Sequence, residues 1–284
     1  MPTPIFEYGG QPGQPVMHLA LANGFPPQTY QPLLRAFTDR FQVLTLLPRP
    51  LWPDGAHQDG LSSWADMADD YLAGMHEHKL SAVIALGHSM GGIAAMLNVL
   101  AEPERFRALI LLDPTLISPL ALRGIALTRV LGMASLTPLS RKALRRRDHF
   151  PDEQSAFDYW RGKGLFRDWS DETLWLYTRG LTQPSSNGTG LELAWSRDWE
   201  AKYYRTIYTQ SYQRMRDLNG LVPTLFIRGG TSSAFSEAAA RRVRSLLPDA
   251  ELRVLDGEGH LFPQAAPIKT YTMIAEWLAA QDLI

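Results

Sequence analysis

The chain has 284 residues, of which 45% are hydrophobic and 20% charged, as in an ordinary globular protein with room for one α/β domain and an insertion. The formal net charge of −1 excludes a general attraction to nucleic acid, and we expect no nucleic-acid partner. The chain has no cysteine, which excludes disulfides, a thiol nucleophile and thiolate metal ligands. The first residues lack the basic segment and apolar core of a signal peptide, so we expect none, and no apolar run approaches the ~20 residues of a membrane span. We therefore expect no integral membrane segment and a cytoplasmic location.

Short apolar runs alternate with helix-like segments in the first part of the chain. Strands are expected at 16–22, 42–47, 82–86 and 108–112, and helices at 31–37, 62–78 and 93–100. Ser63 and Asp66 have the spacing of a capping box, which indicates where the second of these helices begins. This alternation predicts an α/β fold whose parallel sheet is buried on both faces.

The alternation stops at Asp113-Pro114. Residues 116–221 are helix-like and irregular, show no clear strand, and hold five of the eight tryptophans. Strands return at 224–227 and 251–255, and helices at 236–247 and 266–281. We interpret 1–115 and 222–284 as the two parts of one α/β core and 116–221 as a helical cap inserted between them, able to move over the site described next.

The segment Gly87-His88-Ser89-Met90-Gly91-Gly92 joins an expected strand to an expected helix. Strand, Gly-x-Ser-x-Gly and helix in this order are the pattern of a nucleophile elbow. A serine in so tight a turn adopts a strained backbone, and glycine fits at positions where a side chain would collide. The pattern predicts Ser89 as a nucleophile, with the amides of the following helix facing developing negative charge.

A serine nucleophile needs a base, and His260 is the best placed candidate. It lies in the glycine-rich loop 256–263, directly after the last expected strand. Loops at the carboxyl ends of parallel strands gather at one edge of the sheet, so His260 and Ser89 should meet there. His88 is adjacent to the serine in sequence, but the sharp turn should direct its side chain elsewhere.

An oxyanion hole needs two backbone N–H groups. Met90, as the residue after the nucleophile, should supply one of them. The loop after the strand at 16–22 contains Asn23-Gly24-Phe25, and we expect the Phe25 amide to supply the other.

With these motifs the chain resembles the α/β-hydrolase family, in the branch whose elbow reads Gly-His-Ser-Met-Gly-Gly. The resemblance covers nearly the whole chain, from the loop at 23–25 to Gly257-Glu258-Gly259-His260. It implies a mostly parallel eight-stranded sheet with helices on both faces, a helical cap after strand six, and a Ser-His-acid triad in that order. The oxyanion motif departs from the family, in which it usually begins His-Gly, whereas here it begins Asn23-Gly24. We expect no cofactor and no metal.

The triad acid is the larger departure. In the family it usually follows strand seven, but the corresponding loop, 228–235, has no carboxylate, and Ser233 or a neighbour occupies its place. Asp113, at the end of strand six, is the substitute we expect, because some family members have their acid there. Glu237 is a lesser candidate for the triad acid. Two alternatives stay open: Asp113 has only a structural role at the end of its strand, or the triad has no acid.

A serine at the elbow favours acyl transfer, since the family's dehalogenases and epoxide hydrolases have aspartate there. We expect a carboxylesterase- or lipase-like enzyme acting on esters or related small molecules with an apolar acyl or alcohol portion, because the cap is rich in aromatic residues. Most of these aromatic residues should pack the cap helices together. The alternatives are a non-hydrolytic small-molecule binding protein, a cofactor-free haloperoxidase and a C–C bond hydrolase. The oligomeric state is left open.

Residues 141–147 form a basic cluster within the expected cap. A solvated helix face is the simplest interpretation of such a cluster. The functional interpretations are a site for an anionic substrate tail, such as that of a phosphate-bearing thioester, and contact with an anionic membrane surface.

Overall fold

The computed structural model describes residues 2–53 and 57–284. Its main sheet has seven strands in the order β1-β3-β2-β4-β5-β9-β10. Their bounds are β1 Ile5–Gly9, β2 Val16–Ala20, β3 Gln42–Leu46, β4 Val83–His88, β5 Phe106–Leu112, β9 Thr224–Gly229 and β10 Glu251–Leu255. Only β1 is antiparallel to its neighbour, so the sheet is mostly parallel. The expected fold class is confirmed, with seven strands in place of the eight that the resemblance implies.

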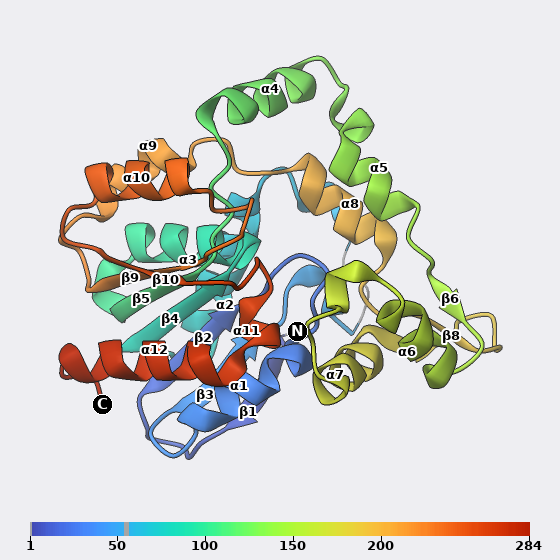
Figure 1. Ribbon diagram of the computed structural model, residues 1–284, viewed down its shortest axis with the longest axis horizontal. Coiled ribbons are helices and arrows are strands. Elements are labelled where there is room, and N and C mark those ends of the chain that lie inside the picture. The colour runs from blue at the N-terminus through green and yellow to red at the C-terminus, as the bar shows by residue number, and fades with distance from the viewer. Residues whose placement is uncertain (1, 54–56) are drawn as a thin grey trace.

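Helices cover both faces of the sheet (Figure 1). They are α1 Gln31–Leu34, α2 Trp64–Glu77, α3 Met90–Ala101, α10 Glu237–Leu246, α11 Phe262–Ala265 and α12 Pro267–Ala280. Helix α2 begins with the expected capping box. The Ser63 hydroxyl accepts from the backbone of the first turn, and the Asp66 carboxylate accepts from the Ser63 backbone N–H. The central strands β2, β4 and β9 are buried along their whole length, as expected for a sheet covered on both faces.

The segment between β5 and β9, called here the inserted segment, contains helices and a second, small sheet. Its helices are α4 Pro119–Val130, α5 Pro138–Leu144, α6 Glu153–Arg161, α7 Asp171–Leu181, α8 Arg197–Arg205 and α9 Ser211–Met215. Its strands are β6 His149–Phe150, β7 Thr182–Pro184 and β8 Leu191–Leu193. The expectation of no strand in this segment was wrong, because strands of two or three residues are too short to leave an alternating pattern. Among the described helices of the whole chain, none is long and apolar enough to cross a membrane.

The inserted segment is held against the core by polar contacts as well as by packing. The Asn23 side-chain amide donates to the Glu200 carbonyl oxygen over 3.0 Å, and the Trp64 indole donates to the Tyr203 carbonyl over 2.8 Å. Most aromatic residues of the segment are buried, as expected: Phe157, Trp160, Phe166, Trp169, Tyr177, Trp195, Trp199 and Tyr203. These contacts place α8 beside the loop that follows β2.

Close backbone approach at the elbow makes Gly91→Ala a test of this arrangement. A Cβ atom on Gly91 would lie 2.1 Å from the Ala20 carbonyl oxygen, so β2 and α3 would have to separate. We expect a loss of at least about 3 kcal/mol in the free energy of unfolding, measured by urea denaturation. Gly124→Ala is the control, because a Cβ atom there meets nothing within 4 Å, and it should not destabilise the protein. Equal stability of the two variants would contradict the close approach.

A buried histidine should make the fold sensitive to acid. Burial lowers the pKa of His18, in β2, to about 3, whereas an unfolded histidine titrates near 6.5. Below about pH 6.5 the unfolded state binds a proton that the folded state does not, so stability falls as pH falls, by about 1.4 kcal/mol per pH unit. His18→Leu should remove that amount from the slope measured by urea denaturation between pH 6 and 4. An unchanged slope in His18→Leu would refute the assignment.

Candidate active site

Ser89 lies in a strained turn between β4 and α3. Its backbone has φ 58° and ψ −116°, outside the regions that most residues adopt. The turn is as tight as the glycines allow, since a Cβ atom on Gly87 would lie 2.4 Å from the Gly91 carbonyl oxygen. This geometry places the serine above the carboxyl ends of the central strands, at the N-terminus of α3.

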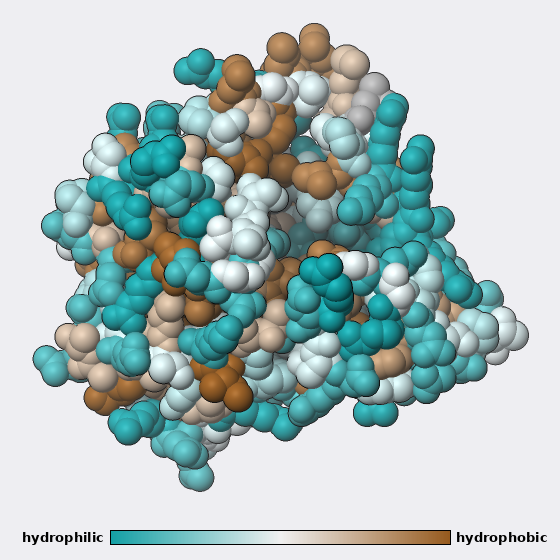
Figure 2. All heavy atoms as spheres, in the orientation of Figure 1, coloured by the Kyte–Doolittle hydropathy of each residue, from teal (hydrophilic) through white to brown (hydrophobic). Residues whose placement is uncertain are grey.

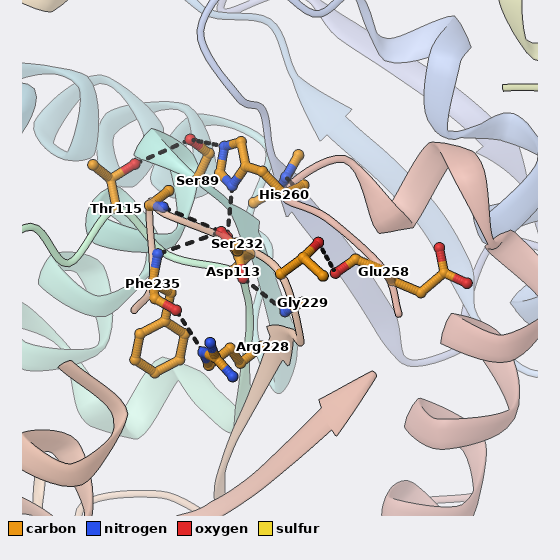
Figure 3. A network of polar contacts seen from close by, with 12 residues as sticks. Ser89, Asp113, Thr115, Arg228, Gly229, Ser232, Phe235, Glu258 and His260 are labelled. Atoms are coloured by element: carbon orange, nitrogen blue, oxygen red, sulfur yellow. Dashed lines mark hydrogen bonds and ion pairs between the residues drawn. The ribbon is translucent and has the colours of Figure 1, made fainter. Parts of the chain in front are cut away.

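The structure brings Ser89, His260 and Asp113 together (Figure 3). The Ser89 Oγ lies 3.0 Å from His260 Nε2, and His260 Nδ1 lies 2.6 Å from Asp113 Oδ2. A carboxylate only accepts hydrogen bonds, so the hydrogen of the neutral ring is on Nδ1 and donates to Asp113. His260 Nε2 is then an acceptor, and the serine hydroxyl donates to it.

The Asp113 carboxylate is completely buried and is held by three donors. Besides the His260 ring, the Gly229 backbone N–H donates to Oδ1 over 2.8 Å, and the Ser232 hydroxyl donates to Oδ2. Burial of a carboxylate is costly unless such partners compensate for the lost water, and these three donors supply that compensation. Asp113 itself has φ 42°, a left-handed conformation that aspartate tolerates better than most residues.

Sequence reasoning missed the part played by Ser232. This residue lies in the loop after β9, where the family usually has its acid, and its hydroxyl donates to Asp113, directly after β5. The loop is fixed by the buried Arg228, which donates to the Phe235 carbonyl over 2.7 Å and to the Gly230 carbonyl over 3.1 Å. The absence of a carboxylate from 228–235 together with a surplus of serines was the available signal.

Glu237, the lesser candidate from the sequence, and Glu258, near His260 in the chain, have other partners. The Glu237 carboxylate pairs with Arg228 over 3.4 Å and with Arg241 over 3.7 Å. Glu258 pairs with Lys269 over 2.8 Å. Of the acids considered from the sequence, Asp113 is the one that the structure places against the histidine.

Two backbone N–H groups were expected near the serine. Met90 is the first residue of α3, so its N–H has no partner inside the helix. The Phe25 N–H donates to the Ala22 carbonyl within its own loop over 3.2 Å, a long bond that an incoming oxygen would have to share. Of the two groups, Met90 is the better prepared donor.

Thr115 and His88 were not assigned a part in the site from the sequence. The Thr115 hydroxyl lies 3.0 Å from Ser89 Oγ and can donate to it while the serine donates to His260. Burial lowers the pKa of His88 well below its ordinary value, so this ring is neutral. His88 donates from Nε2 to the His260 carbonyl oxygen over 3.0 Å and accepts from the Tyr30 hydroxyl at Nδ1 over 2.7 Å. It therefore ties the loop that carries His260 to the turn that carries Ser89.

Beside the loop that follows β2, the inserted segment places aromatic side chains and a partly buried ion pair. Phe25 packs against Trp169 and Tyr177, with ring centroids 6.1 and 5.7 Å apart. Arg146 donates to the Glu200 carboxylate over 2.6 Å and to the Tyr177 hydroxyl, and burial raises the pKa of Tyr177 to about 12. In the described part of the chain, no group of three or more His, Cys, Asp or Glu side chains is arranged to hold a metal ion.

Comparison with known proteins agrees with this architecture. The family model described as "alpha/beta hydrolase fold" matches residues 47–263. A Haemophilus influenzae protein, named as a proposed esterase/lipase, is 24% identical over 228 residues, which cover 80% of this chain and 70% of the relative.

Solved structures show the same fold at low identity. The crystal structure of E-2-(acetamidomethylene)succinate hydrolase has a TM-score of 0.80 and 21% identity, with 97% of this chain and 94% of that chain covered. The thioesterase domain from the curacin biosynthetic pathway has a TM-score of 0.74 and 19% identity, over 95% and 94% of the two chains. A family match over most of the chain, on a sheet and an elbow of the expected kind, establishes that this protein belongs to the α/β-hydrolase fold family.

Proposed function

We propose that this protein is a serine hydrolase that cleaves carboxylic esters or related acyl compounds with an apolar portion through an acyl-enzyme on Ser89. The observation that carries the proposal is the unbroken line of hydrogen bonds from Ser89 Oγ through the His260 ring to the buried Asp113 carboxylate. Nucleophile, base and orienting acid in this relation are what activation of a serine hydroxyl requires.

In the first half of the reaction, Ser89 Oγ attacks the substrate carbonyl carbon and its proton passes to His260 Nε2. The imidazolium formed is stabilised by Asp113, against which Nδ1–H already lies. The negative charge that develops on the carbonyl oxygen faces the Met90 N–H at the positive end of α3, with Phe25 N–H as the second donor. When the intermediate collapses, His260 returns the proton to the leaving alcohol.

In the second half, water replaces the serine as the nucleophile. His260 accepts a proton from the water, which attacks the acyl carbon, and the same donors stabilise the second intermediate. The proton then returns from His260 to Ser89 Oγ as the carboxylic acid is released. In each step, Nε2 of His260 exchanges the proton while Nδ1–H stays hydrogen-bonded to Asp113.

The apolar substrate portion is proposed from the aromatic side chains that pack on Phe25, the residue proposed as the second oxyanion donor. Phe25 and the aromatic residues that pack on it lie on the side of the inserted segment, and the Arg146 charge there is paired with Glu200. The esterase/lipase name of the relative and the thioesterase among the similar folds agree with acyl transfer as the reaction class. We propose that residues 116–221 act as a cap that moves to admit the substrate.

A fluorophosphonate probe tests the nucleophile. It should label the wild-type protein covalently, and Ser89→Ala should abolish labelling while the protein remains folded, as judged by circular dichroism. Thr115→Val is the matched control, because it removes a neighbouring hydroxyl and leaves the serine, and it should still be labelled. Persistent labelling of the Ala variant would exclude Ser89, and no labelling of the wild type together with no turnover of 4-nitrophenyl esters would favour a binding protein.

Replacement of Asp113 by Asn tests the proposed acid. The variant should lose at least about 10² in kcat on a chromogenic short-chain ester, because the histidine tautomer is no longer fixed and the imidazolium is no longer stabilised. Glu237→Gln should keep wild-type turnover, since Glu237 lies against Arg228 and Arg241. Full activity in Asp113→Asn, or an equal loss in Glu237→Gln, would overturn the assignment.

A further inference from the structure

The outer face of α4 exposes apolar side chains to solvent. Leu120 is 79% exposed, Leu127 58%, Val130 85% and Leu131 60%. Their spacing of three, four and seven residues places them on one side of the helix. Figure 2 shows hydrophobic side chains gathered over α4, at the top of the molecule. Met133 and Leu139 continue this exposed surface toward α5, so these six are the majority of the large hydrophobic side chains that the described chain exposes.

The inner face of α4 is already used, which shows that the outer face is not a misplaced core. Leu122 is buried and Ile125 packs against the core. Arg129 fixes the helix to the body, since it donates to the Ile207 carbonyl over 3.1 Å and to the Ser62 carbonyl over 2.7 Å. The helix is therefore held in a position that keeps its outer face turned away from the protein.

The same part of the chain is strongly basic. Residues 114–147 contain six arginines, one lysine and no Asp or Glu, in a protein whose net charge is −1. Arg123, Arg141, Lys142 and Arg145 are exposed. Neighbouring carboxylates are already paired, Glu200 with Arg146 and Asp148 with Arg197. Arg216 and Arg242 lie with Arg123 along a groove between α4 and the helices α9 and α10, which extends the positive surface.

We propose that this surface, formed by the exposed side chains of residues 120–145 and called here the α4–α5 surface, docks on the face of an anionic lipid bilayer. Apolar side chains beside a group of cations, with no acid among them, are the combination that binds a lipid interface. The leucines and Val130 would enter the boundary between headgroups and acyl chains, while the arginines and Lys142 contact the headgroup charges. A second copy of the chain fits less well, because an isologous contact would press two sets of like charges together.

The test is co-sedimentation of the full-length chain with vesicles, in a Ser89→Ala background so that no lipid can be hydrolysed by the proposed reaction. Vesicles of 30% phosphatidylglycerol in phosphatidylcholine should bind the protein at least about 10²-fold more tightly than pure phosphatidylcholine, because each cation near an anionic surface contributes about 5-fold. Binding should weaken steeply between 0.05 and 0.5 M NaCl. Because this readout requires no turnover, it is independent of the proposed function.

Two matched pairs of variants separate the contributions. The triple variant Arg141→Gln, Lys142→Gln, Arg145→Gln should lose roughly 10²-fold in affinity, whereas the exposed set Arg35→Gln, Arg40→Gln, Arg107→Gln should lose less than about 5-fold. Leu127→Ser with Leu131→Ser should lose at least about 10-fold, whereas Ile268→Ser, at a still more exposed position, should have no effect.

The proposal is overturned if the protein does not bind anionic vesicles, or if the α4–α5 variants bind as well as their controls with unchanged melting temperatures. A stable dimer in analytical ultracentrifugation that Leu127→Ser with Leu131→Ser dissociates would also overturn it, since the surface would then bind a second copy. Affinity for polyglutamate without affinity for vesicles would point instead to an acidic protein partner.

Discussion

The buried carboxylate of Asp113 is the interaction on which the geometry of the site depends. It lies where β5 ends and accepts from three donors in two segments: the His260 ring in the last loop, and the Gly229 backbone and Ser232 hydroxyl at the end of β9 and just after it. A charge with no access to water must have such partners or the fold loses several kcal/mol. The carboxylate needs these donors, and the donors need an acceptor. Asp113 therefore joins the end of β5 to the end of β9 and to the loop that carries His260.

A second constraint is the strained turn at Ser89, which only close glycines allow. The turn directs the serine toward His260, and His88, on the other side of the same turn, holds the His260 carbonyl. His88 thus holds the backbone of the loop that carries His260, while Ser89 contacts the His260 ring. Removal of either contact would leave the imidazole free to turn away from the hydroxyl.

Much of the core could be predicted from the sequence, because its signals are local. The alternation of apolar runs and helices predicted six of the seven strands of the main sheet, missing β1, and the capping box at Ser63 predicted the start of α2. The elbow and the glycine-flanked His260 were recognisable because their chemistry imposes glycine at fixed positions. Asp113 was reached by elimination, since no carboxylate follows β9.

What the sequence did not reveal depends on contacts between distant segments. The hydroxyls of Ser232 and Thr115 reach Asp113 and Ser89 only after β5 and β9 have paired, and nothing in their neighbours marks them. The short strands β6, β7 and β8 pair segments up to about forty residues apart with too few residues to show a period. The exposed leucines of α4 have the same spacing as core residues, so only the three-dimensional structure distinguishes the face that packs from the face that does not.

The most direct test of this account is the proton shared by His260 and Asp113, observed by NMR. A hydrogen bond of 2.6 Å between imidazole and a buried carboxylate should give a far-downfield proton resonance, since a short charge-assisted bond strongly deshields its hydrogen. The resonance should persist in Ser89→Ala and disappear in Asp113→Asn with the fold intact. A resonance that survives in Asp113→Asn, or that is missing from the wild type at low temperature, would contradict the claim that Asp113 orients the base.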